Sequence, residues 1–220
     1  MNGCQISLGG AQLTALGSGA LWWADQRLLC VSDLHLGKSE RILRRGGTAL
    51  PPYETQDTLS RLEADLDATD ARIVICLGDS FDDLSAAQNL NEIERMWITK
   101  LQTGRRWIWI EGNHDPGPID LGGSHLAELH LPPLMFRHIA QKGKSGEVSG
   151  HYHPKVQLSI RNKRITRPAF LLDFDRLILP AFGTYTGGLN SNDDTLTQIM
   201  RDDATAIMTG HVPHRVPMPR

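Results

Sequence analysis

The sequence has few cysteines and no long apolar run. Its 220 residues include only Cys4, Cys30 and Cys76, which are widely spaced. An odd number of so few cysteines excludes a disulfide framework and is typical of a protein in a reducing compartment. No stretch of 18 apolar residues occurs, and the N-terminal residues do not resemble a secretory signal. We therefore expect a cytoplasmic protein without a membrane span.

The sequence also lacks an excess of charge of one sign. The formal net charge is −2, so no global positive field exists that would bind nucleic acids non-specifically. Any contact with nucleic acid must therefore be local. The hydrophobic fraction of 40% is that of an ordinary globular protein. A chain of this length suits one domain, which we expect over residues 1–220.

Strand and helix patterns alternate through the middle of the chain. The expected order is a strand over 27–32, a short helix over 38–45, a helix over 53–68, a strand over 72–77, a helix from about 85 to 101 and a strand over 107–110. Ser85 is the expected N-cap of the last helix. After His153 the patterns are mainly those of β-strands. This order indicates a parallel sheet covered on both faces.

Four apolar strands each end in a small group of polar side chains. The groups are Ser32-Asp33-Leu34-His35, Gly78-Asp79-Ser80-Phe81-Asp82, Gly112-Asn113-His114-Asp115 and Gly150-His151-Tyr152-His153. Because ligands of open α/β sheets bind beyond the C-terminal ends of the strands, we expect the four groups to converge on one metal site. Carboxylates with imidazoles suit manganese, iron or zinc, whereas Mg²⁺ and Ca²⁺ favour oxygen ligands.

The spacing inside the groups supports this interpretation. Two residues apart in extended backbone, Asp33 and His35 would point the same way and could hold one ion. A carboxylate at Asp79 could bridge two ions, and His151 and His153 could serve neighbouring ions. Each pattern alone has an ordinary alternative, such as a chance pair, a helix-entry aspartate or an exposed histidine pair.

Taken in this order, the four groups resemble the signature of the calcineurin-like metallophosphoesterases over residues 28–153. The resemblance implies a four-layer α/β/β/α sandwich, with two packed mixed sheets flanked by helices. It also implies two divalent metal ions, for which we expect Mn²⁺, with iron or zinc as alternatives. The implied ligands are Asp33, His35, Asp79, Asn113, His138, His151 and His153. Asp33, His35 and His153 would hold one ion, Asp79 would bridge, and Asn113 and His151 would hold the second.

The assignment of His138 rests on the family's further histidine, which lies on a strand before the last group. His125 and His130 are rivals, but their segment has more of the character of a loop or turn.

The resemblance further implies that His114 is a catalytic acid and not a ligand. It would protonate the leaving oxygen while a metal-bridging hydroxide attacks phosphorus in line. The second acid of the Asp79 group would orient His114; this is Asp82, with Asp83 as its rival. Asp115 is expected to fix the loop.

The wider context resembles the bacterial DNA-ligase-associated metallophosphoesterases over residues 12–190. The matching segments are Ser32 to Lys38, Phe136 to His138, Gly150 to Lys155 and Leu179 to Asn190. This implies a phosphodiesterase acting on a nucleotide or nucleic acid, a connection to DNA repair and an association with a DNA ligase and a helicase. The alternatives are a repair nuclease, a nucleotide or phosphomonoester hydrolase of the same superfamily, and an inactive binding scaffold.

Two basic clusters and a C-terminal motif remain open. Either cluster could guide a phosphate backbone toward the metals, or could be a solvated surface. The clusters are Arg41, Arg44 and Arg45, and Arg161, Lys163, Arg164 and Arg167. Gly210-His211-Val212-Pro213-His214 resembles a metal motif, but it lies near the chain end, where we expect fraying.

Overall fold

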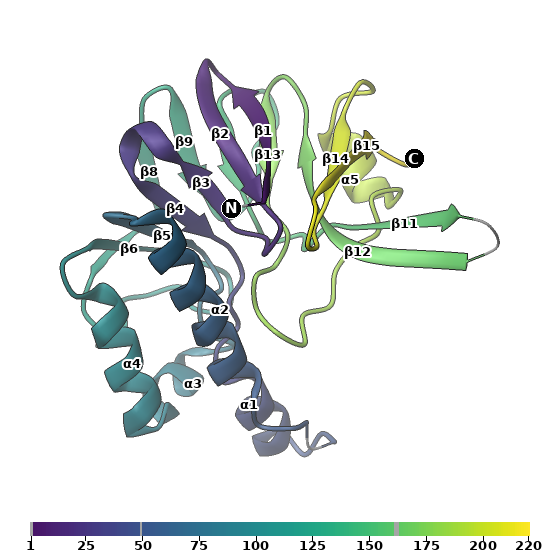
Figure 1. Ribbon diagram of the computed structural model, residues 1–220. Helices are drawn as coiled ribbons and strands as arrows, with labels where there is room; N and C mark the ends of the chain where they lie inside the picture. Colours follow the sequence, from purple (N-terminus) through teal and green to yellow (C-terminus); the bar gives the residue numbers. More distant parts are fainter. Residues whose placement is uncertain (1, 49, 161–162) are drawn as a thin grey trace.

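Two β-sheets pack face to face, and helices cover the outer face of each (Figure 1). The computed structural model describes residues 2–48, 50–160 and 163–220. This four-layer α/β/β/α arrangement confirms the fold class expected from the sequence. None of the helices among the described residues has the length and apolar character that a bilayer span requires.

The first sheet has seven strands in the order β1-β2-β3-β4-β5-β6-β7. The strands are β1 Gly3–Leu8, β2 Ala11–Leu16, β3 Leu21–Trp23, β4 Leu28–Val31, β5 Ile73–Leu77, β6 Arg106–Ile110 and β7 Ser124–Leu126, with a 3₁₀ turn at Ala24–Gln26. β1 to β4 are antiparallel, whereas β4 to β7 run parallel. The parallel crossovers carry α1 Lys38–Arg44, α2 Glu54–Thr69, α3 Leu84–Asn89 and α4 Glu92–Gln102. The strand and helix alternation expected from the sequence is therefore present.

The second sheet has eight strands in the order β15-β14-β12-β13-β10-β9-β8, with β11 paired to β12 off this path. The strands are β8 Glu128–Leu131, β9 Leu134–Arg137, β10 Glu147–Ser149, β11 Lys155–Ile160, β12 Lys163–Leu172, β13 Arg176–Ile178, β14 Thr205–Met208 and β15 His214–Pro217. The helix α5 Asp194–Ile199 covers its outer face. The expectation of a frayed C-terminus was wrong, because β15 pairs with β14 over four residues.

Alternation of side chains along the strands produces the layers. In β4, Leu28 and Cys30 join the core between the two sheets, while Leu29 and Val31 pack toward α2 and α4. β5 and β6 divide their side chains in the same way. Since both faces are covered, these strands are continuous apolar runs in the sequence.

The helix expected over residues 85–101 is two helices. Asn91 begins α4 with a capping box: its side chain accepts a hydrogen bond from the Glu94 N–H at 2.9 Å, and the Glu94 carboxylate accepts one from the Asn91 N–H at 3.2 Å. Ser85 does not cap α3. Asp83 does so, accepting a hydrogen bond from the Ala86 N–H at 2.7 Å.

Replacing the capping residue of α4 tests this boundary. Asn91→Ala should lower the free energy of unfolding by about 1 kcal/mol, because a helix N–H loses its acceptor. Urea denaturation followed by circular dichroism measures the change. Asn89→Ala is the matched control, since Asn89 is exposed and its side chain makes no hydrogen bond within the described part of the chain; it should shift the value by less than about 0.5 kcal/mol. Equal effects of the two variants would contradict the boundary.

Candidate metal centre

The four polar groups meet where β4, β5, β6 and β10 end. β4, β5 and β6 are adjacent parallel strands of the first sheet, and β10 belongs to the second. The groups are joined directly: the Asp33 N–H donates to the Gly78 carbonyl at 3.2 Å and the His35 N–H donates to the Asp79 carbonyl at 3.0 Å. From the second sheet, the His151 N–H donates to Asp33 Oδ2 at 3.0 Å. The structure therefore brings together the groups that the sequence predicts to converge.

The backbone that presents these side chains is left-handed and not extended. Five of the seven residues predicted as ligands have positive φ, namely Asp33 (53°), His35 (46°), Asp79 (45°), His151 (71°) and His153 (46°). The expectation that Asp33 and His35 lie in extended backbone and point the same way for that reason was therefore wrong. Their side chains nevertheless approach a common point. Non-glycine residues rarely adopt this conformation, and strain of this kind is concentrated at functional sites.

One group of ligand atoms lies around Asp33. Asp33, His35 and His153 each place one nitrogen or oxygen within 4.8 Å of the others. His153 Nε2 lies 3.1 Å from Asp33 Oδ1, and His35 Nε2 lies 3.4 Å from His153 Nε2. Two imidazoles and a carboxylate at these separations form a donor set that fits a divalent transition metal.

A second group lies around Asp79. His138 Nε2 lies 3.4 Å from Asp79 Oδ2, 3.2 Å from His151 Nδ1 and 3.0 Å from Asn113 Oδ1. Asp79, His138 and His151 also satisfy the separations of a metal site. The second donor set therefore contains every residue that the sequence assigned to the second ion.

The two rival histidines lie elsewhere. His125 is in β7 and His130 is in β8, so the expectation that their segment is a loop or turn was wrong. His125 stacks on Trp109, with ring centroids 6.4 Å apart. Within the described residues, neither histidine belongs to a cluster that could hold a metal. His138 directly follows β9 and is the histidine that reaches the site.

Neighbouring groups hold both carboxylates in the ionised form. Burial would raise the pKa of Asp79, but the hydrogen bond and charge of His138, together with the His114 N–H, lower it to about 2. Burial also acts to raise the pKa of Asp33, and His153, His138 and the Ser32 hydroxyl outweigh it, so this pKa is lowered as well. Ionised carboxylates are the form that binds a cation.

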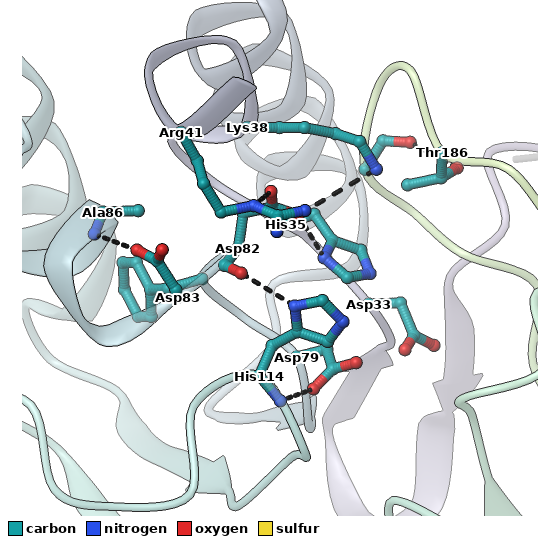
Figure 2. A network of polar contacts seen from close by, with 12 residues as sticks. Asp33, His35, Lys38, Arg41, Asp79, Asp82, Asp83, Ala86, His114 and Thr186 are labelled. Atoms are coloured by element: carbon teal, nitrogen blue, oxygen red, sulfur yellow. Dashed lines mark hydrogen bonds and ion pairs between the residues drawn. The ribbon is translucent and has the colours of Figure 1, made fainter. Parts of the chain in front are cut away.

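His114 lies beside the ligand groups, as Figure 2 shows. Its N–H donates to Asp79 Oδ1 at 2.8 Å, and its ring Nδ1 lies 2.8 Å from the main-chain carbonyl oxygen of Asp82. The Asp82 carboxylate makes its shortest contacts elsewhere: Oδ1 lies 2.9 Å from His35 Nδ1, and the other oxygen contacts Arg41. One atom each of His35, Asp82 and His114 nevertheless lies within 4.8 Å of the others. The hydrogen-bond contact of Asp82 with His114 is therefore made by its main-chain carbonyl, and the orienting role expected for Asp82 stays a prediction.

The rival acid Asp83 has a different position. It caps α3 and pairs with Arg44 at 2.9 Å. Asp82 in turn faces His35 Nδ1 and leaves Nε2 directed toward His153. A carboxylate behind a histidine in this way fixes the orientation of the ring that would bind a metal.

Asp115 joins two of the loops. Its buried carboxylate accepts hydrogen bonds from the N–H groups of Ser80, Phe81 and Gly112 at 2.8 to 3.1 Å. Burial raises its pKa to about 6, with the nearby charge of Asp79 adding to the rise, even though the three N–H groups favour the ionised form. The loop-fixing position expected for Asp115 agrees with these contacts.

A glycine-containing loop also supports the site, a structural role that was not among the expectations from the sequence. In the loop over residues 181–190, the Gly183 N–H donates to the Asp33 carbonyl at 3.1 Å. A Cβ at Gly183 would lie 2.0 Å from the Leu34 oxygen, and one at Gly188 would lie 2.0 Å from the His153 oxygen. The glycines allow the loop to pack directly on the backbone of the two ligand segments. The repeated glycines of this loop were the sequence feature that could have indicated such close packing.

The C-terminal histidine motif lies outside the centre. His214 is in β15, and His211 borders a pocket near Asn2. Neither belongs to a metal-type cluster in the part of the chain that the structure describes. We therefore assign the motif no ligand role.

Comparison with known proteins decides the family. The family model described as calcineurin-like phosphoesterase matches residues 26–215. The chain belongs to that family. As a calcineurin-like phosphoesterase, it is a metal-dependent hydrolase of phosphoric esters, which confirms the class of enzyme predicted from the sequence.

Solved structures and curated proteins add to this comparison. The phosphoesterase is similar to the crystal structure of Pseudomonas putida nuclease MPE, with a TM-score of 0.78 and 28% identity over 97% of this chain and 100% of that one. A Streptococcus pneumoniae protein described as a predicted phosphoesterase is 12% identical over 86% of this chain and 96% of that one, with a TM-score of 0.32. The curated proteins include no match.

A glycine at the closest approach of two loops offers a test of the centre. A Cβ at Gly112 would lie 2.2 Å from both the backbone nitrogen and Oδ1 of Asp79. Gly112→Ala should therefore displace Asp79, weaken Mn²⁺ binding about tenfold or more, and lower the free energy of unfolding by about 1–3 kcal/mol. Isothermal titration with Mn²⁺ and urea denaturation measure both effects. Gly117→Ala, in the same loop and with no atom within 4 Å of its new Cβ, should bind Mn²⁺ normally; unchanged binding by Gly112→Ala would contradict the geometry.

Proposed function

We propose that the protein is a phosphodiesterase that uses two divalent metal ions. The observation that carries the proposal is the pair of adjoining donor sets around Asp33 and Asp79, with His114 beside them. Asp33, His35 and His153 would hold one ion, and Asn113, His138 and His151 the other, with Asp79 between them. Bound ions would supply Lewis acidity, lowering the pKa of a water molecule and neutralising charge on the phosphate. Mn²⁺ is the proposed metal, with iron or zinc as alternatives.

In this proposal His114 supplies the proton for the leaving oxygen. Its Nδ1 faces the carbonyl oxygen of Asp82 at 2.8 Å, and a carbonyl can only accept, so Nδ1 carries a hydrogen. Nε2 is then the ring atom left to hold a second proton and transfer it to the leaving group. The ring packs edge-on against His35, with centroids 5.1 Å apart, which keeps it next to the donor sets.

A diester substrate is supported by the space beside the centre. A pocket of about 400 Å³ borders Asn113 and His138, and its lining also includes Arg137 and Gln141. A second ester substituent could lie there, whereas a phosphomonoester needs no such space. The similarity to a protein named as a nuclease supports nucleic acid as the diester. A single domain over residues 1–220, a cytoplasmic location, a role in DNA repair and cooperation with a DNA ligase and a helicase belong to the same proposal.

Purified protein assayed with several metals and substrates tests the function. Hydrolysis of bis(4-nitrophenyl) phosphate should be fastest with Mn²⁺ among Mn²⁺, Mg²⁺, Zn²⁺ and Fe²⁺, and should exceed that of 4-nitrophenyl phosphate and cyclic nucleotides. Asp79→Asn should lose metal binding and at least about 99% of this activity, because the proposed bridging carboxylate is lost. Asp120→Asn, at an exposed position, is the matched control. Near-normal turnover by Asp79→Asn would overturn the two-metal proposal, and preference for the monoester would overturn the diester assignment.

The proton-donor assignment predicts a dependence on the leaving group. His114→Ala should lower kcat about 100-fold or more for a dinucleoside monophosphate, a diester in which both possible leaving groups are alcohols, because an alkoxide needs a proton. The loss should be much smaller when 4-nitrophenolate leaves from bis(4-nitrophenyl) phosphate, since that anion is stable without a proton. Steady-state kinetics on both substrates measure the ratio. An equal loss on both would exclude His114 as the acid.

A further inference from the structure

The hairpin of β11 and β12 forms an arm that projects from the second sheet (Figure 1). Its outer part, residues 155–160 and 163–168, comprises six cross-strand pairs from Lys155 with Pro168 to Ile160 with Lys163. Six residues of strand extend about 20 Å. Residues 163–168 are all exposed, whereas β12 becomes buried from Ala169 onward. The arm begins two residues after His153, so its base lies at the metal centre.

The arm carries basic residues and no acidic ones. Residues 155–160 and 163–168 contain Lys155, Lys163, Arg164 and Arg167 and lack aspartate and glutamate. Arg161, the remaining member of the basic cluster in the sequence, lies outside the described residues. The whole chain has a net charge of −2, so this concentration of positive charge is local.

The two basic clusters differ in whether carboxylates of the described residues neutralise them. Arg41, Arg44 and Arg45 of the other basic cluster pair with Asp82 or Asp83. By contrast, the four described cations of the arm pair with no carboxylate in residues 2–48, 50–160 and 163–220. The two clusters that the sequence left as equals therefore differ. Unneutralised like charges on an exposed ribbon repel each other and attract a polyanion.

The cations of the arm are divided between its two faces. Cross-strand partners share a face, so Gln157 with Thr166 and Ser159 with Arg164 lie together with Lys155 on one polar face. Pro168 shares this face, whereas Lys163 and Arg167 lie on the opposite one, so the two cations at the outer end of the arm, Lys163 and Arg164, are on both of its faces. Lys155 at its base donates to the Thr186 carbonyl at 3.2 Å, in the loop that packs on the ligand segments.

We propose that the arm binds the phosphate backbone of a nucleic acid strand whose scissile diester lies at the metal centre. The proposal rests on the phosphodiesterase function proposed above and adds where the substrate lies. Cations along the arm neutralise successive phosphates and release their counterions, so binding depends on salt concentration. Backbone contacts of this kind position a strand without reading its sequence.

A second copy of the chain is the rival occupant, because the outer edge of β11 pairs with no strand among the described residues. Pairing two arms would bring their positive charges together without any acid on either arm to offset them. Charged side chains along a free edge disfavour this kind of association. The observations therefore favour the nucleic acid.

Charge reversal at the outer part of the arm tests the proposal. Lys163→Glu with Arg164→Glu should weaken binding of a fluorescently labelled oligothymidylate at least about tenfold and reduce the slope of log K against log salt by about 1.4, the value for two lost contacts to a single strand. Binding is measured in EDTA, where no cleavage occurs. Oligoribonucleotide and duplex DNA are measured in parallel to determine which nucleic acid binds best.

A control of equal charge change distinguishes the arm from the rest of the surface. Arg106→Glu with Lys144→Glu alters two exposed cations, the first residue of β6 and a residue that precedes β10, at the strand ends opposite the metal centre. This pair should leave the oligonucleotide affinity within about threefold of the original. Equal effects of the two double variants, or normal binding by the arm variant, would overturn the proposal.

Hydrolysis of bis(4-nitrophenyl) phosphate separates the arm from the reaction. The arm variant should keep its kcat/KM on this small diester, since the arm residues lie outside the donor sets. Lys163→Gln with Arg164→Gln should give a smaller loss of oligonucleotide binding in the same direction, which excludes misfolding as the cause. Loss of a dimer in light scattering, with unchanged oligonucleotide binding, would assign the arm to a second copy and overturn the proposal. Failure of the unaltered protein to hydrolyse any diester would overturn the proposed function instead, while binding in EDTA still reports on the arm.

Discussion

Two buried carboxylates, Asp33 and Asp79, set the constraint on which the centre depends. Each is almost fully buried and held ionised, and an uncompensated charge in such a position costs several kcal/mol. The compensation comes mainly from His138, His151 and His153, which follow strands of the second sheet. The carboxylates follow strands of the first sheet. Burying these charges therefore requires the two sheets to meet at one place, so the requirements of the fold and of the site coincide.

Asp82 couples two parts of the centre with different atoms. Its carboxylate faces His35 and contacts Arg41, whereas its carbonyl faces His114. The orientation of a proposed ligand and that of the proposed acid thus depend on the same short turn after β5. Removing the Asp82 carboxylate would affect the contacts with His35 and Arg41, whereas moving the Asp82 backbone would affect the contact with His114. This separation explains why sequence spacing alone could not assign the role of Asp82.

The sequence predicted the strands, the helices and the meeting of the four polar groups better than it predicted helix boundaries and the backbone conformation of the ligand residues. Apolar strands ending in Asp, His and Asn were visible because both faces of β4, β5 and β6 are buried and the polar groups follow directly. The break before α4 was hidden, since apolar residues continue at helical spacing through Leu90 while the capping box uses ordinary polar residues. Positive φ at Asp33 and His35 was hidden as well, because neither is glycine and the conformation is imposed by contacts with loops distant in sequence.

The two basic clusters show that the sequence also could not predict which charges are neutralised. In the sequence both are groups of three or four cations on a surface segment. In the structure, Arg41, Arg44 and Arg45 neutralise Asp82 and Asp83 next to the centre, so their charge serves to hold the turn after β5. The arm has no acids, and its four described cations pair with no carboxylate of the described residues, so they are available to an external anion. The first cluster therefore stabilises the turn beside the metal centre, whereas the arm is the cluster proposed to bind substrate. The two roles differ because carboxylates lie next to the first cluster and not next to the second, and not because the number of cations differs.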